Sequence, residues 1–271
     1  MEGEKRFQEQ FVVLSNRAVL QLTGPDRVRY LNGQVTNDVS TISEEESKAA
    51  CVCNLKGKVE FLVWIRSDGE SLWIDGQLDQ REALLERLDR YLIADDCEFH
   101  DRTEDGRLVH HFFSDAEGAT TQRCLSTGKD LWVSNDELNP FPPGKELELG
   151  EFEASQLQQG IPRAPDEITG AEFPAELGID SWTVDFHKGC YLGQEVISRI
   201  ESVGRVKRHL CLVVAKEPFP QNSVLRNVDG KDFLPTRASE EISGEFHLSL
   251  AWLKSDTMTR QPVHVQLVAD S

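Results

Sequence analysis

Apolar and polar residues alternate over short stretches in the first half of the chain, which is the pattern of β-strands with one buried face. Such strands are predicted at 49–54, 59–66, 71–75, 97–100 and 107–113. Turn-forming residues at 55–58 and 67–70 join the first three strands into an antiparallel meander. Alternation over 11–22, interrupted by polar residues at 15–17, predicts a β-hairpin at the start of the chain.

Two helices are predicted beside these strands. The first begins at Pro25, because proline suits the first helical turn, and ends near Gly33, where glycine can take a left-handed cap. The second covers 79–92 and carries an apolar stripe of leucines. The polar run 34–39 is interpreted as an Asx-turn after the first helix, with contact to a ligand as the alternative. Helices added to an antiparallel meander indicate an α+β fold.

The second half of the chain has a different pattern. A short helix is predicted over 152–159, and a loop over 161–179 is long enough to indicate a functional connection. Beyond residue 209 we expect a small all-β unit, similar to a barrel. Its predicted strands are 210–215, 223–228, 245–253 and 263–268.

Between these halves lies the segment KGCYLGQE, from Lys188 to Glu195. A glycine inside a helix or strand costs roughly 1 kcal/mol, so two of them indicate either a turn with positive φ or a close backbone approach to a bound group. Lys188 stands beside Cys190, and a cationic neighbour lowers the pKa of a thiol. We therefore interpret Cys190 as a reactive thiol, with a small buried core residue as the alternative.

Positive charge is concentrated near this segment. Five cationic residues stand against two glutamates between 188 and 209, namely Lys188, Arg199, Arg205, Lys207 and Arg208. The whole chain of 271 residues has a net charge of −18. We predict that the basic residues form one wall of a site for a small anionic ligand, with a solvated surface strand as the alternative.

Composition limits the classes of partner. With 47 acidic against 29 basic residues, the chain is not expected to bind DNA or RNA, because that binding depends on cationic surface. Apolar runs of about five residues are far below the ~20 needed to cross a bilayer. The first ten residues lack the apolar core of a signal peptide, so we expect a reducing cytoplasm in which the six cysteines remain thiols.

Other candidate chemistry is weak. Cys51 and Cys53 share a face of a predicted strand, but no second ligand pair completes a metal site, and we expect both to be buried. His110 and His111 point to opposite faces of their strand and form no joint site, and His187 is expected at the surface. The dinucleotide, P-loop, hydrolase-elbow and zincin motifs are absent from the sequence.

The segment KGCYLGQE resembles the signature of the YgfZ family of folate-binding proteins, which are relatives of the glycine-cleavage T-protein, an aminomethyltransferase. The resemblance spans about residues 11–215. It also rests on the stretches 30–39, 54–58, 160–162, 173–176 and 204–208.

The resemblance implies three subdomains in a ring around a central hole, one of them ferredoxin-like, with an aminomethyltransferase-like region at 1–205 and a C-terminal β-barrel at 206–271. It implies tetrahydrofolate in the hole, with its carboxylates near Arg205, and a role with client or assembly proteins in making or repairing iron–sulfur clusters. Cys190 and Lys188 would be the reactive pair. The folate contacts implied are Asn37, Asp38, Lys56, Tyr191, Gln194, Glu195, Arg199 and Arg205.

One departure from the aminomethyltransferase pattern bears on the reaction. Those enzymes carry two aspartates just after the glycine hairpin, and the matching positions here are Phe61 and Leu62. Glu60 is one residue early, which turns its side chain to the other face of a strand. Aminomethyl transfer is therefore not favoured. A one-carbon transferase that uses Glu60 or Asp38, and a folate-binding module without chemistry, remain the alternatives.

Overall fold

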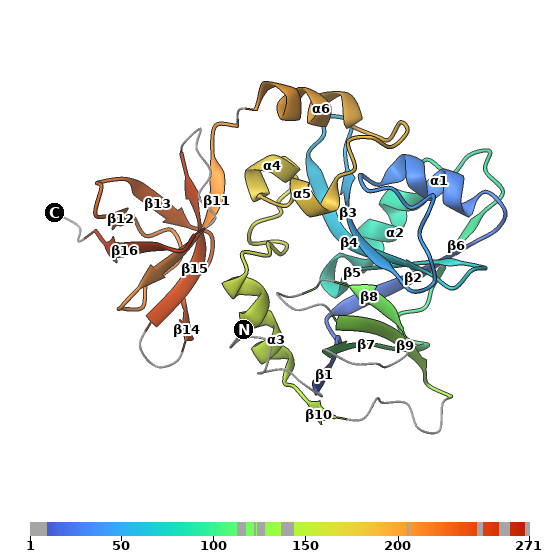
Figure 1. The fold of residues 1–271 in the computed structure, drawn as a ribbon, viewed down its shortest axis with the longest axis horizontal. Helices are drawn as coiled ribbons and strands as arrows, with labels where there is room; N and C mark the ends of the chain where they lie inside the picture. The colour runs from blue at the N-terminus through green and yellow to red at the C-terminus, as the bar shows by residue number, and fades with distance from the viewer. Residues whose placement is uncertain are drawn as a thin grey trace.

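The computed structural model describes residues 10–112, 118–121, 123, 128–136, 144–204, 206–242, 246–254 and 261–268. They form two open sheets, a closed barrel and connecting helices (Figure 1). Strand pairing is antiparallel except for two short parallel contacts, and the predicted α+β character agrees with helices that cover an antiparallel sheet.

The first sheet has the order β3-β4-β5-β2-β6. Its strands are β2 (Arg17–Thr23), β3 (Ser47–Cys53), β4 (Val59–Ser67), β5 (Leu72–Gln77) and β6 (Glu98–Asp101). Helices α1 (Arg27–Gln34) and α2 (Arg81–Asp89), the latter preceded by the short 3-10 helix η1 (Leu78–Gln80), cover one face. Leu31 of α1 and Leu84 and Leu88 of α2 are fully buried against Leu20 and Ile74, as the leucine stripe predicts.

Both predicted helix ends need correction. Gly33 lies inside α1 rather than after it, and the helix ends at Gln34 with Val35 in an extended conformation. The second helix ends at Asp89, three residues before the predicted Leu92, and its first turn is the 3-10 helix η1.

The second sheet shows that the predicted N-terminal hairpin is wrong. This sheet has the order β10-β1-β7-β9-β8. Its strands are β1 (Gln10–Val13), β7 (Gly106–Phe112), β8 (Ala119–Thr121), β9 (Gly128–Ser134) and β10 (Lys145–Glu146). Residues 14–16, which include the first two polar residues of the predicted turn, carry the chain from β1 in this sheet to β2 in the first, so the two strands do not pair.

A buried ion network joins the two sheets. Arg17 and Arg123 both donate to the Asp75 carboxylate, with Arg17 Nε 2.7 Å from Oδ1. Arg123 Nε also donates to Asp130 Oδ2 at 2.7 Å, and Asp130 Oδ1 lies 2.9 Å from His110 Nδ1. Because every charge has a partner, the network can lie in the interior without an isolated ion.

The C-terminal barrel is confirmed. β11 (His209–Ala215) pairs with both β16 (Val263–Leu267) and β15 (Phe246–Leu253), and this closes the ring β11-β16-β12-β13-β15. The sequence prediction missed two short strands, β13 (Asp232–Pro235) and the appended β14 (Glu240–Ile242). The strand predicted at 223–228 contains β12 (Leu225–Asn227) but is longer at both ends. Phe233 and Leu225 fill the barrel interior.

The remaining helices follow β10 of the second sheet in the chain and precede the barrel. They are α3 (Leu149–Gln158), α4 (Pro174–Leu177), α5 (Asp180–Thr183) and α6 (Gln194–Val203). Of these, α3, α4 and α5 lie between the sheets and the barrel (Figure 1). The loop predicted at 161–179 thus contains α4, and α6 replaces the surface strand considered for the basic segment. The free face of the first sheet, with Leu62 and Trp64, shares a core with Leu177 and with Leu250 of the barrel. The predicted division at 205/206 falls between α6 and β11.

Candidate functional site

The two glycines of KGCYLGQE have different surroundings. Gly193 has a φ of 85°, and a Cβ there would lie 2.6 Å from the Asn54 carbonyl oxygen and 2.9 Å from the Gly57 Cα. At Gly189, no atom of the described residues beyond its two chain neighbours lies within 4 Å of that position. The close backbone approach is therefore made at Gly193, and it is made to the β3–β4 turn of the protein itself.

Lys188 is buried and holds the turn after α1. Its Nζ donates to the carbonyl oxygens of Asn32 (2.7 Å), Val35 (2.9 Å) and Asn37 (2.6 Å). Burial lowers the pKa of Lys188 to about 8, although Asp38 and Asp185 oppose the shift. Cys190 is exposed, and among the described residues no hydrogen bond joins it to Lys188.

The turn at 34–39 is an Asx-turn, as predicted. Asp38 Oδ1 accepts hydrogen bonds from the Ser40 hydroxyl (2.6 Å) and the Ser40 backbone amide (2.8 Å). These bonds lower the pKa of Asp38, the hydroxyl contributing most. Asn37 Nδ2 donates to the Ala49 carbonyl oxygen at 2.8 Å. Both residues, which were predicted to contact folate, are thus engaged in hydrogen bonds within the protein.

Tyr191 points into the core rather than into a pocket. Its ring packs in the cluster that contains Cys51 and Cys53, and burial raises the pKa of its hydroxyl. Both cysteines are fully buried, as predicted, and contact with Cys51 together with burial raises the pKa of Cys53. Within the described part of the chain, no group of three metal-binding side chains is found.

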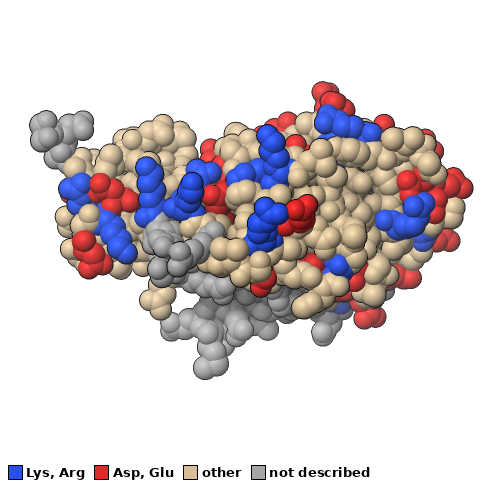
Figure 2. Space-filling model, turned by 90° about the horizontal axis from the view of Figure 1, so that it is seen from above, with Lys and Arg blue, Asp and Glu red and all other residues tan. Residues whose placement is uncertain are grey.

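The basic residues near the signature do not form a continuous basic surface. Arg199 pairs with Glu195 at 2.8 Å on exposed α6, and Arg208 pairs with Glu172 at 3.0 Å. Lys56 is exposed at the β3–β4 turn, and Gln194 is half-buried at the start of α6. From the side of α6, basic side chains lie in separate groups with acidic ones beside them (Figure 2). Arg205 lies outside the described residues.

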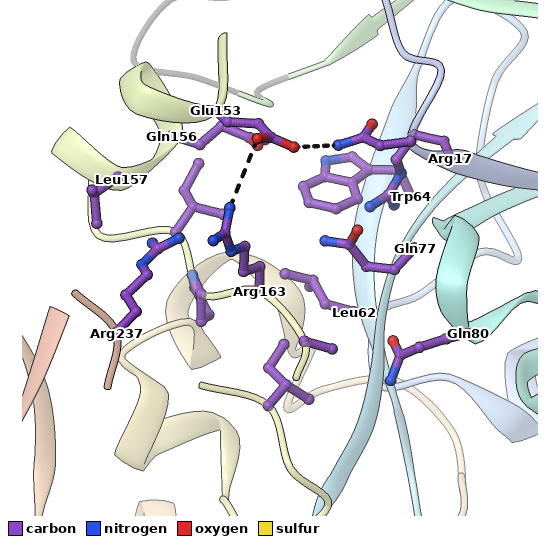
Figure 3. A pocket seen from close by; sticks show the side chains of 15 residues that line it. Arg17, Leu62, Trp64, Gln77, Gln80, Glu153, Gln156, Leu157, Arg163 and Arg237 are labelled. Carbon is purple, nitrogen blue, oxygen red and sulfur yellow. Dashed lines mark hydrogen bonds and ion pairs between the residues drawn. The ribbon is translucent and has the colours of Figure 1, made fainter. Parts of the chain in front are cut away.

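A second candidate site is the central pocket, with a cavity volume of about 30 Å³, between the first sheet, α3 and the barrel (Figure 3). The seven described residues predicted as folate contacts do not line it. Its polar lining comes from distant parts of the sequence and includes Arg17, Trp64, Gln77, Gln80, Glu153, Gln156, Arg163 and Arg237. One feature of the sequence pointed to this pocket, namely the long loop predicted at 161–179 as a functional connection. This loop supplies Arg163 to the pocket lining.

Three buried polar atoms of the central pocket have no hydrogen bond to a described residue, and one of them, Arg237 Nε, still has an ion-pair contact to Glu167 at 3.4 Å. The Trp64 indole N–H and the Asn16 side-chain oxygen are buried without a hydrogen bond to any described residue. Asn16 Nδ2 donates to Glu153 Oε1 at 2.7 Å, and the Arg17 guanidinium lies 4.9 Å from the centre of the Trp64 ring. Donors and acceptors of this kind suit a flat heteroaromatic ligand. A cavity of this volume holds about one or two waters, so a larger ligand requires side chains to move.

The two positions that match the aspartate pair of the aminomethyltransferases lie on opposite faces of the first sheet. Leu62 lines the central pocket, whereas Phe61 packs with α1 and α2 on the opposite face of the sheet. Glu60 Oε2 accepts a hydrogen bond from Arg87 Nε at 2.9 Å and does not line the pocket. The pocket wall after the glycine hairpin is therefore apolar.

Similarity searches with the sequence found curated relatives. No family model matches the chain. A tRNA-modifying protein YgfZ from Escherichia fergusonii is 29% identical over 232 residues, which cover 74% of this chain and 71% of that protein. An iron–sulfur cluster assembly factor IBA57 homolog, mitochondrial, from Pyricularia oryzae is 26% identical over 77% of this chain and 58% of that protein. The predicted resemblance to YgfZ proteins is thereby confirmed.

A solved structure is similar in fold. The glycine cleavage system aminomethyltransferase T from Bartonella henselae superposes with a TM-score of 0.72 at 11% identity, over 90% of this chain and 78% of that one. The fold is therefore that of the T-protein. Among the described helices, none has the length and apolar character needed to cross a bilayer.

Proposed function

We propose that this chain binds tetrahydrofolate in the central pocket and supports the assembly or repair of iron–sulfur clusters in client enzymes, with Cys190 as its reactive thiol. The observation that carries the proposal is the exposure of Cys190 at the apex of a turn whose two ends are fixed, by Lys188 and by Gly193. The names of the YgfZ and IBA57 relatives support the iron–sulfur role.

The central pocket supports the choice of ligand. Its orphan indole N–H, the orphan Asn16 oxygen and the Glu153 carboxylate offer both donors and acceptors to a heterocyclic edge. Arg163 and Arg237 line the same pocket, but they already pair with Asp166 at 2.8 Å and Glu167 at 3.4 Å, so a ligand carboxylate would share them with these groups. In the bound state the folate would supply a site for one-carbon units, while the chain's residues bind and orient it.

Protein clients fit this chain better than tRNA itself. A net charge of −18 opposes a phosphate backbone, and the basic groups around α6 are largely paired. A reducing compartment such as the cytoplasm, expected from the sequence, is part of this proposal.

Aminomethyl transfer is the second candidate function, favoured by the T-protein fold alone. Leu62 presents no group that could take or give a proton at the pocket wall, and Glu60 is engaged by Arg87. We therefore rank this reaction below cluster maturation. Turnover of an aminomethyl donor that disappears in Glu60→Gln would reverse this order.

Complementation tests the proposed role. In a bacterial strain deleted for its own YgfZ, the wild-type chain should restore the activity of iron–sulfur enzymes and Cys190→Ala should not. Cys97→Ala is the matched control, because Cys97 is half-buried and burial raises its pKa to about 11, which makes it a poor nucleophile. Full restoration by Cys190→Ala would remove the thiol from the mechanism.

A further inference from the structure

The turn that carries Cys190 is fixed at its two ends but not at its apex. On one side the Lys188 ammonium bonds the Asn32 carbonyl in the last turn of α1 and two carbonyls just after the helix. On the other side the Leu192 amide donates to the Gly33 carbonyl oxygen at 3.1 Å. At the apex, Cys190 is exposed. A Cβ added at Gly189 would have no atom of the described residues within 4 Å, apart from those of its chain neighbours. The position of the thiol is therefore set by the two ends of the turn.

Lys188 is saturated by the bonds it makes there. An ammonium has three hydrogens, and the carbonyl oxygens of Asn32, Val35 and Asn37 accept all three within 2.9 Å. Carbonyls at the end of a helix lack partners within the helix and attract a cation. The ammonium thus serves the end of α1 and has no hydrogen left for the thiol.

The other charged groups near Lys188 form hydrogen bonds with the backbone of the same two segments, the turn after α1 and the start of the signature. Lys48 Nζ donates to the Asp38 carbonyl oxygen at 3.0 Å. Asp185 Oδ1 accepts from the backbone amides of His187 (2.7 Å) and Lys188 (3.2 Å). Together with the Asp38 carboxylate, these groups surround the Lys188 ammonium.

We propose that Lys188 is a positioning residue, which clamps the Cys190 turn to the end of helix α1 and does not act on the thiol through its charge. The functional importance of the clamp rests on the proposed function of Cys190. The clamp can be measured on the purified protein alone. The clamp prediction can therefore fail while complementation succeeds, and complementation can fail while the clamp is observed.

Two measurements on the purified chain test the clamp: amide hydrogen exchange at Val35, Thr36 and Leu192, and alkylation of Cys190 by iodoacetamide across a range of pH. In Lys188→Met we expect exchange at these amides to be about tenfold faster and alkylation about threefold faster below pH 8, where Lys188 of the wild type keeps its three hydrogens. The pH at which alkylation is half-maximal should not move to more alkaline values. Lys188→Arg, which keeps a cationic donor, should restore part of the protection.

Two control variants distinguish loss of the clamp from a simple loss of charge and from a general loss of stability. Lys56→Met removes one exposed charge on the same side of the molecule and should change neither measurement. Leu225→Ala opens a cavity in the barrel core, so it lowers global stability without touching the turn. The proposal is overturned if Lys188→Met shifts the pH profile of alkylation toward alkaline values with exchange unchanged, or if Leu225→Ala accelerates exchange at Leu192 equally.

Discussion

At the scale of single residues, substitution of the two glycines of the signature should change the free energy of unfolding by very different amounts. Gly193→Ala should lower the free energy of unfolding by at least about 2 kcal/mol, because alanine disfavours positive φ and its Cβ would strike the Asn54 carbonyl. Gly189→Ala should change it by less than about 0.5 kcal/mol. Urea unfolding measures both. Equal losses in the two variants would contradict the packing of Gly193 against the β3–β4 turn.

The buried ammonium of Lys188 predicts a pH dependence of stability. Its pKa is about 8 in the folded protein and near 10.5 when exposed, so between these values the folded chain binds fewer protons than the unfolded chain. The free energy of unfolding therefore gains a contribution that rises with pH, by about 3 kcal/mol across this window. Lys188→Met lacks that contribution. Urea unfolding of both proteins at the two ends of the window measures it, and parallel pH profiles would contradict it.

Residue roles were predictable where the partner is near in sequence. The Asx-turn at Asp38 depends on Ser40, and the common burial of Cys51 and Cys53 follows from strand alternation. The role of Lys188 was not predictable, because its acceptors lie about 150 residues away in the chain. Charge and proximity to Cys190 suggested an electrostatic effect, whereas the three carbonyl contacts indicate a structural one.

At the scale of elements, alternation predicted strands but not their partners. β1 and β2 follow each other closely in the chain but lie in different sheets, and so do β6 and β7. Alternation does not predict this, because it shows which face of a strand is buried but not which element covers that face. Helix α6 was missed since charges and glycines dominate its surroundings. Its Ile197, Ile200 and Val203 are nevertheless spaced as on one helical face.

The ion network between the two sheets predicts a large loss on removal of one member. Asp75→Asn should lower the free energy of unfolding by about 3–5 kcal/mol, because it leaves Arg17 and Arg123 buried without their shared counter-ion. Asp232→Asn is the control: its pair with Arg226 on the barrel is exposed to solvent, so its loss should leave the urea midpoint unchanged. Similar urea midpoints for Asp75→Asn and the wild type would show that the network does not hold the sheets together.

At the scale of the whole molecule, the barrel was predicted and the central pocket was not. A barrel is built from neighbouring strands, so turn spacing reveals it in one stretch of sequence. The pocket draws Arg17, Trp64, Glu153, Arg163 and Arg237 from separate elements, and no motif joins them. The resemblance to YgfZ proteins directed attention to the signature instead, which lies outside this pocket.

Binding of tetrahydrofolate, measured by anaerobic calorimetry, decides between the two locations. Trp64→Phe keeps an aromatic ring but removes the indole N–H, which has no partner among the described residues, together with one ring of the buried indole. Urea unfolding of the variant therefore accompanies the binding measurement. If the ligand accepts that hydrogen, the variant should bind about tenfold more weakly, the equivalent of one hydrogen bond. Lys56→Met, at the β3–β4 turn beside the signature, should bind as the wild type does. Weakening by Lys56→Met alone would move the ligand to the signature, and a wild type that does not bind would leave the central pocket without its proposed ligand while the clamp at Cys190 stands.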